Sequence, residues 1–206
     1  MLDFELIPAT DRDSRRLMVM LHGLGDSLEG FRWFPPALNL SWLNFALVNA
    51  PDDYYGGFSW FDFEGDPKPG VERSFRLLVE LLDALRVRGF PTEETTLGGF
   101  SQGCLMSIEV ALRYPHRLAG VVGISGRVSH PEKLVADLSP VAMQQRFFIS
   151  HGTMDPVIPF ALAREHVNVL KAAGLRVEWH ELVKAHTIVG EDELELIREF
   201  VRRRYE

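Results

Sequence analysis

Cysteine is almost absent from this chain, which has 206 residues and only Cys104. No intrachain disulfide can form, so the sequence does not require an oxidising compartment. Because Cys104 lies on the inner side of a predicted helix, we expect it to act as a small buried hydrophobe rather than as a catalytic or redox group.

Long apolar runs and an excess of basic residues are absent as well. Residues 1–16 carry acidic side chains where a signal peptide needs a basic start and then an apolar run. No later stretch approaches the roughly 20 apolar residues of a membrane span. With 22 Lys and Arg against 29 Asp and Glu, the net charge is −7, which disfavours nucleic acid as a partner. We expect a cytoplasmic protein with no integral membrane segment, and the sequence leaves a homodimer open.

Apolar residues make up 46% of the chain, enough for one well-buried core, and we expect residues 1–206 to form a single domain. Short apolar runs alternate with amphipathic helical patterns, which predicts an α/β fold with a mostly parallel central sheet and helices on both faces. Strands are predicted at 4–7, 17–21, 45–48, 95–100, 120–124, 146–150 and 176–182. Helices are predicted at 71–86, 105–112, 131–136, 160–170 and 194–201, and a loop at 64–70.

A serine lies between the strand predicted at 95–100 and the helix that follows. Residues 99–103 read G-F-S-Q-G, the pattern G-x-S-x-G, and the strand before and helix after make this pattern informative. The flanking glycines permit a turn sharp enough to expose the Ser101 side chain and to hold a strained backbone there. The sequence therefore favours Ser101 as a nucleophile over the alternative that it only caps the helix.

Four predicted loops follow the carboxyl ends of strands, where ligands bind in parallel sheets. They carry Ser101, Asp155 and His186 in an order typical of an α/β-hydrolase. Asp155 as a simple turn residue and His186 as a surface histidine are the alternatives, but their joint placement favours a triad. Two other loop histidines, His22 and His151, are expected to shape their loops. The loops are 22–26, 99–103, 151–159 and 184–187.

Each triad side chain would have its own task in acyl transfer. Imidazole, with an unperturbed pKa near ~6.5, can take the proton of a serine hydroxyl at neutral pH. The aspartate would hold the histidine tautomer and stabilise the imidazolium. Two main-chain N–H groups must meet the developing oxyanion. The candidates are Gln102, directly after the nucleophile, and Leu24 in the glycine-rich loop.

Aromatic residues are concentrated between Phe31 and Phe63, which hold 11 of the 22 Phe, Trp and Tyr residues. Within this region, residues 54–61 combine two glycines that suit a loop with side chains too apolar to be left in water. We predict that this region walls an apolar substrate pocket, and core packing is the competing interpretation. The candidate pocket residues are Phe31, Phe58, Trp60 and Phe61.

In these motifs the chain resembles the phospholipase/carboxylesterase family of α/β-hydrolases, which includes the acyl-protein thioesterases. The resemblance implies Ser101, Asp155 and His186 as the triad, with Leu24 and Gln102 as oxyanion-hole donors. It also implies no metal, no cofactor, and hydrolysis of carboxylic esters or thioesters. The matching pieces are LHGLGDSLEGF (21–31), NAP (49–51), GGFSWFD (56–62), GGFSQG (98–103), HGTMDPVIP (151–159), HTI (186–188) and ELELIREFV (193–201).

The chain departs from the usual pattern of this family at several places. Cys104 and Ala185 stand where glycine is usual, and residues 125–127 (Ser-Gly-Arg) replace a region that commonly carries a tryptophan. The segment between Asp62 and Val71 is shorter than in the acyl-protein thioesterases, where it helps cover an acyl chain. We therefore expect an open site, without a large lid, that favours short or medium acyl groups.

The leading hypothesis is a cofactor-free serine esterase that cleaves small-molecule carboxylic esters through an acyl-enzyme. An acyl-protein or acyl-CoA thioesterase, or a lysophospholipase, is the alternative within the same chemistry. A perhydrolase or lyase activity and a non-catalytic hydrolase-fold binding protein stay open, because a fold alone does not decide a function.

Overall fold

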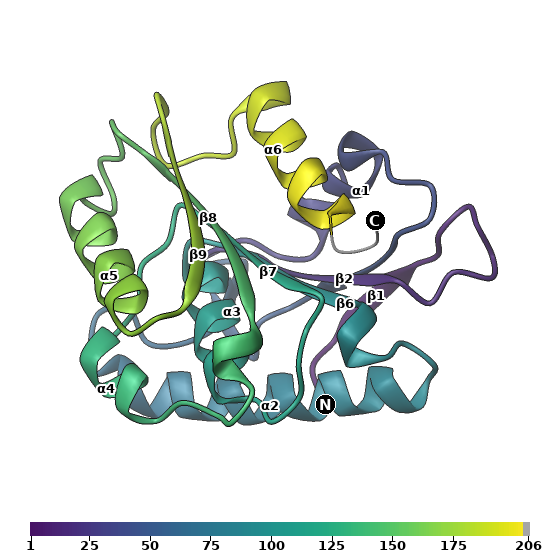
Figure 1. Ribbon diagram of the computed structural model, residues 1–206, viewed down its shortest axis with the longest axis horizontal. Coiled ribbons are helices and arrows are strands. Elements are labelled where there is room, and N and C mark those ends of the chain that lie inside the picture. The colour runs from purple at the N-terminus through teal and green to yellow at the C-terminus, as the bar shows by residue number, and fades with distance from the viewer. Residues whose placement is uncertain (204–206) are drawn as a thin grey trace.

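The computed structural model describes residues 1–203 and has a seven-stranded sheet at its centre. The strand order is β1-β3-β2-β6-β7-β8-β9, and neighbours run parallel except β1, which is antiparallel to β3 (Figure 1). All seven strands predicted from the sequence are confirmed, with small shifts at their ends. They are β1 (Phe4–Ile7), β2 (Leu17–Leu21), β3 (Asn44–Val48), β6 (Thr95–Phe100), β7 (Gly120–Ile124), β8 (Arg146–Gly152) and β9 (Arg176–Leu182).

Alternate side chains of the buried strands enter two cores, one on each face of the sheet. In β2, Leu17, Val19 and Leu21 belong to one core, whereas Met18 and Met20 belong to the other. This two-sided burial explains why the strand reads as a continuous apolar run.

Helices cover both cores, as the sequence predicts. Helices α2, α3, α4 and α5 contribute to the first core, and α1 and α6 to the second, on the opposite side of the sheet in Figure 1. No helix within residues 1–203 is long and apolar enough to cross a membrane. The helices are α1 (Phe34–Leu38), α2 (Pro67–Val87), α3 (Gln102–Arg113), α4 (Pro131–Ala136), α5 (Phe160–Ala172) and α6 (Gly190–Arg202), and short 3-10 helices lie at Glu29–Phe31, Thr92–Glu94 and Ala142–Gln144.

Helix α2 begins earlier than the sequence pattern indicates. The prediction of a loop over 64–70 is wrong for its second half, because the helix already starts at Pro67. The Asp66 carboxylate accepts the Lys68 N–H at 3.0 Å, and a proline in the first turn removes no intrahelical hydrogen bond. Gly70 lets this turn lie against Phe61, since a Cβ there would be 2.7 Å from the Phe61 Cα.

The aromatic segment contains a hairpin where the sequence predicts only a loop. Strands β4 (Asp52–Tyr54) and β5 (Gly57–Ser59) pair antiparallel. Tyr55 and Gly56 form the turn with φ values of 45° and 90°, as a two-residue turn of type I′ requires. After this hairpin, Trp60 contacts His22 and Gln102, which directly follow β2 and the β6 turn.

Candidate active site

Ser101 occupies a sharp turn between β6 and α3. Its φ of 54° lies in the left-handed region, and its N–H donates to Ile124 O at 2.9 Å. Only glycine fits on either side, because a Cβ on Gly99 would lie 2.2 Å from Gly103 O and a Cβ on Gly103 would lie 2.2 Å from Leu21 O. The Ser101 side chain makes no capping hydrogen bond to α3, so the capping alternative finds no support.

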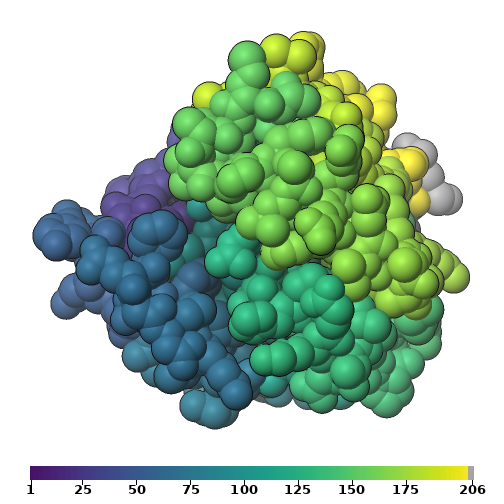
Figure 2. All heavy atoms as spheres, turned by 90° about the vertical axis from the view of Figure 1, so that its left-hand side faces the viewer, coloured from purple at the N-terminus to yellow at the C-terminus, as the bar shows by residue number. Residues whose placement is uncertain are grey.

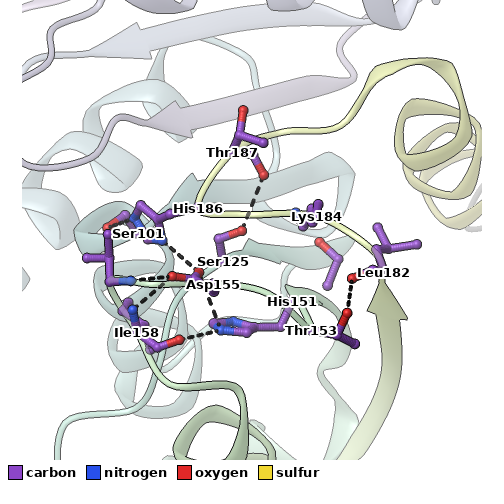
Figure 3. A network of polar contacts seen from close by, with 12 residues as sticks. Ser101, Ser125, His151, Thr153, Asp155, Ile158, Leu182, Lys184, His186 and Thr187 are labelled. Carbon is purple, nitrogen blue, oxygen red and sulfur yellow. Dashed lines mark hydrogen bonds and ion pairs between the residues drawn. The ribbon is translucent and has the colours of Figure 1, made fainter.

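The structure brings Ser101, His186 and Asp155 together in one chain of polar contacts (Figure 3). His186 Nε2 lies 2.9 Å from Ser101 Oγ, and His186 Nδ1 lies 2.8 Å from Asp155 Oδ2. Ser101 follows β6, Asp155 follows β8 and His186 follows β9, so segments far apart in sequence meet at one edge of the sheet. The Asp155 side chain is fully buried, whereas 15% of the His186 side chain is exposed.

Asp155 is held in its charged form by the loop around it. The N–H groups of Val157 and Ile158 donate to Asp155 Oδ1 at 2.8 and 2.9 Å. Burial alone would raise the pKa of Asp155, but these N–H groups and His186 together hold it below its usual value. Oδ2 is therefore left as an anionic acceptor facing His186.

His151 lies behind Asp155 and is fully buried. Its Nε2 is 3.0 Å from Ile158 O and 3.5 Å from Asp155 Oδ2, so it contacts two other residues of the loop 151–159. Burial lowers the pKa of His151. Its position fits the expected loop-shaping role, and His186 rather than His151 stands between Ser101 and the Asp155 carboxylate.

The glycine-rich loop after β2 packs directly against the nucleophile turn. A Cβ on Gly23 would lie 3.3 Å from the Ser101 Cβ. His22 fixes this loop, since its Nε2 accepts the Ala50 N–H at 3.0 Å and its Nδ1 lies 2.6 Å from Gly23 O. Burial lowers the pKa of His22, which agrees with a neutral ring that both donates and accepts. Leu24 follows directly and lines the cavity.

Gln102, the residue after the nucleophile, is fixed through its side chain. Its Oε1 accepts the Trp60 N–H at 3.0 Å, and its Nε2 donates to Phe61 O at 3.1 Å. These bonds tie the first residue of α3 to the segment that follows the hairpin. The main-chain N–H of Gln102 lies at the N-terminus of a 12-residue helix, whose dipole favours negative charge at that end.

A cavity of about 820 Å³ opens beside Ser101 and His186. Figure 2 shows the molecule hollowed between the blue segments around residues 50–65 and the green segments around residues 155–165. Most of the wall is apolar. The lining residues are Gly23, Leu24, Asp26, Phe61, Phe63, Phe100, Ser101, Gln102, Leu105, Arg127, Val157, Ile158, Pro159, Leu162 and His186.

Of the four aromatic residues predicted to line the pocket, Phe61 alone does so. Trp60 is fully buried in the first core and donates from its indole N–H to His22 O at 2.9 Å. Phe31, 4% exposed, packs in the second core. Phe58 packs against the first core, and its main chain exchanges hydrogen bonds of 2.9 Å with Gly25 and Asp26. The assignments of Phe31 and Trp60 are wrong, because both side chains are buried in the cores. The assignment of Phe58 finds no support, since its half-buried side chain packs against the first core and does not line the cavity.

The cavity residues that sequence reasoning missed lie beside motifs it had found. Phe100 precedes the nucleophile, Leu105 is one helical turn after it, and residues 157–159 belong to the segment that carries Asp155. Proximity to Ser101 in the strand–turn–helix was the signal that could have identified the first two. Within residues 1–203, no group of three or more His, Cys, Asp or Glu side chains is placed to hold a metal ion.

The parallel sheet, the sharp strand-to-helix turn and the serine–histidine–aspartate contacts together define an α/β-hydrolase. Residues 2–204 match the model of the family described as Phospholipase/Carboxylesterase. Acyl-protein thioesterase 1 of Schizosaccharomyces pombe is 34% identical over 163 residues, which cover 71% of each chain. The crystal structure of esterase PE8 superimposes with a TM-score of 0.88 at 28% identity and covers 98% of both chains.

The chain belongs to the phospholipase/carboxylesterase family. A further structure, that of Zea mays acyl-protein thioesterase 2, has a TM-score of 0.84 at 22% identity over 99% of both chains and supports the fold. The resemblance drawn from the motifs is thereby confirmed. The protein is an enzyme that hydrolyses ester or thioester bonds, with a serine hydrolase's fold.

Proposed function

We propose that Ser101, His186 and Asp155 are the catalytic triad of a carboxylesterase that acts on short to medium acyl chains through an acyl-enzyme. The observation that carries this proposal is the continuous contact from Asp155 Oδ2 through His186 to Ser101 Oγ, with distances of 2.8 and 2.9 Å. A hydroxyl so placed can lose its proton to imidazole while the carboxylate stabilises the resulting cation.

In the first half of the reaction, His186 Nε2 takes the Ser101 proton as Oγ attacks the substrate carbonyl carbon. The carbonyl oxygen becomes an oxyanion, and the main-chain N–H groups of Leu24 and Gln102 donate to it. His186 then gives its proton to the leaving alcohol or thiol, and the acyl group stays on Ser101. Each oxyanion donor in such a site typically contributes about 3 kcal/mol of transition-state stabilisation.

In the second half, His186 takes a proton from water as the water oxygen attacks the acyl-enzyme carbonyl. The tetrahedral intermediate collapses, the bond to Ser101 Oγ breaks, and His186 returns the proton to the serine. The carboxylic acid leaves. The Asp155 carboxylate stays ionised throughout, as its lowered pKa requires.

We infer a preference for short to medium acyl chains from the short connection beside the cavity. Only residues 62–66 connect the Phe61 wall with the start of α2. Apolar walls from Phe61, Leu105 and Leu162 suit an acyl group. The alternative is an acyl-protein thioesterase, and it is supported by the similarity to the Schizosaccharomyces pombe protein of that name.

The test is hydrolysis of 4-nitrophenyl esters from acetate to palmitate, beside the matching acyl thioesters. Ser101→Ala should lower kcat/KM by at least about 10⁴-fold, because triad members act as a unit. Ser129→Ala, which removes a hydroxyl outside the cavity, is the matched control and should keep the wild-type rate. An unchanged rate in Ser101→Ala would overturn the triad.

The same assay decides between the two histidines of the site and between the two substrate classes. His186→Ala should lose turnover in the manner of Ser101→Ala, and retention of activity there with loss in His151→Ala would reject His186 as the base. A maximum at short esters agrees with the proposal. A maximum at palmitoyl thioesters would support the thioesterase alternative.

A further inference from the structure

One positive charge lines the cavity. Among the described residues of its wall, Arg127 is the only lysine or arginine. It follows β7 and is half-buried, unlike Arg12, Arg76 and Arg117, which are exposed to solvent. A guanidinium on a largely apolar wall interacts more strongly with a bound charge than one in open water.

Arg127 has no carboxylate partner in the described part of the chain. No Asp or Glu oxygen of residues 1–203 forms an ion pair with it, and its hydrogen bond to Val128 O is long, at 3.4 Å. By contrast, the half-buried Arg113 contacts three carboxylates and the buried Arg198 contacts two. Four of the five guanidinium N–H groups of Arg127 are therefore left for a ligand.

The carboxylate that shares the wall, Asp26, is engaged locally. Its Oδ1 accepts the Ser27 N–H at 2.8 Å, and the same carboxylate fills the space beside Gly30, where a Cβ would be 2.0 Å from Oδ1. It forms no ion pair with Arg127. Arg127 is thus left without an ion-pair partner among the described residues of the cavity wall.

Arg127 is close in sequence and space to the nucleophile turn. Ile124 of β7 pairs with Phe100 of β6 and accepts the Ser101 N–H. At Gly126, a Cβ would lie 2.9 Å from Ser101 O, so the chain passes directly beside the serine before it reaches Arg127. A substrate bound at Ser101 therefore lies next to this segment.

We propose that Arg127 is a specificity-determining residue that binds an ionised carboxylate on the substrate, so that the preferred substrates are esters carrying a second, free acid group. This inference rests on the proposed function, since it concerns the same cavity. The guanidinium matches a carboxylate with two parallel N–H···O bonds, which a lysine cannot do. The chain's net charge of −7 would otherwise disfavour an anionic substrate.

The experiment compares matched chromogenic esters on the wild-type protein. Mono-4-nitrophenyl adipate and its methyl ester differ by one negative charge on the acyl side. The pair 3-carboxy-4-nitrophenyl butyrate and 4-nitrophenyl butyrate places the charge on the alcohol side. We expect kcat/KM to favour the anionic member of at least one pair, and higher ionic strength to weaken that preference.

Arg127→Met should lower the anionic-to-neutral ratio of kcat/KM at least about tenfold, the effect of losing one charge-assisted hydrogen bond. Arg127→Lys should keep part of the preference. Arg117→Met, which removes an exposed arginine outside the cavity, should leave the ratio within about twofold. The pair in which the ratio falls identifies the side of the ester that Arg127 faces.

A ratio unaffected by Arg127→Met, or a wild-type preference for the neutral ester in both pairs, would overturn this proposal. If Arg127→Met did not fold, the salt dependence of the wild-type ratio would decide. Ser101→Ala is measured with the same two pairs of esters. Activity that persists in Ser101→Ala rejects the triad, whereas serine-dependent activity without charge preference rejects only the role of Arg127.

Discussion

Lys184 Nζ lies 2.5 Å from Glu193 Oε1, and neither side chain reaches solvent. The same carboxylate accepts Ser150 Oγ–H at 2.6 Å and the Val189 N–H at 2.7 Å. This ion pair closes the loop that carries His186, because Lys184 precedes the histidine by two residues and Val189 follows it by three. The loop is thereby fixed to β8 and α6 from within the protein.

Breaking this pair from one side should destabilise the fold strongly. Glu193→Gln leaves a buried ammonium without its counter-charge, and we expect a loss of about 3–5 kcal/mol in the free energy of unfolding. The double variant Lys184→Met/Glu193→Gln should recover a large part of this loss. Urea unfolding of the wild type, Glu193→Gln and the double variant measures both effects.

The exposed pair of Arg203 and Glu178, 2.6 Å apart, provides the comparison. Glu178→Gln should cost at most about 1 kcal/mol because water screens the two charges. Equal losses at the two sites would show that burial adds nothing to the Lys184 pair.

A methyl group added at Gly103 should disrupt the nucleophile turn. The new Cβ would lie 2.2 Å from the backbone oxygen of Leu21, which belongs to the central strand β2 and cannot move alone. We expect Gly103→Ala to lower the free energy of unfolding by about 3 kcal/mol. It should also lower kcat/KM at least about 100-fold, because it displaces Ser101.

Gly89→Ala separates this clash from the general cost of replacing glycine. Gly89 has φ of 100° with no atom within 4 Å of an added Cβ, and it lies after α2, away from the cavity. Gly89→Ala should lower the free energy of unfolding by about 1–2 kcal/mol and leave turnover intact. Wild-type kinetics in Gly103→Ala would show that the turn is more adaptable than its packing indicates.

Glu109 on α3 should make stability depend on pH in an unusual direction. Burial, together with Glu72 and Asp137, raises the pKa of Glu109 to about 7 in spite of Arg113. Between its ordinary pKa of 4.5 and about 7, the folded state binds more protons than the unfolded state, so this group's contribution to the free energy of unfolding falls as the pH rises.

Glu109→Gln removes that contribution. The free energy of unfolding of the variant should differ little from that of the wild type at pH 4.5. At pH 8 it should be higher by up to about 3 kcal/mol, the equivalent of the shift in pKa. Urea unfolding at both pH values tests this. A variant less stable than the wild type at pH 8 would mean that the contact with Arg113 outweighs the cost of burial.

The strands and the triad loops could be predicted from the sequence because their signals are local. Continuous apolar runs mark strands buried on both faces, and Asp155 follows one of them. A β-prone run that ends in small residues precedes Ser101, and an alternating strand precedes His186. Their contact in the structure depends only on the carboxyl ends of parallel strands meeting at one edge. The catalytic roles of these residues stay a prediction until the variants are measured.

The pocket walls could not be assigned in this way. Trp60 and Phe61 are adjacent and equally apolar, yet they point in different directions, and Trp60 is held inside by its bond to His22 O. Which side chain faces the cavity is set by the hairpin turn at Tyr55 and Gly56 and by the early start of α2 at Pro67. Both are tertiary features that hydrophobic spacing does not encode.

Cys104 sits behind the nucleophile turn, fully buried, and burial raises the pKa of its thiol to about 12. Its sulfur is confined by Gly123 and Gly126, where an added Cβ would lie 2.7 and 2.4 Å from Sγ. The protein thus offers iodoacetamide no competing thiolate, and Ser101, the proposed nucleophile, is the oxygen that a fluorophosphonate probe should label. Active-site titration with such a probe should count working molecules at one per chain, without interference from sulfur chemistry.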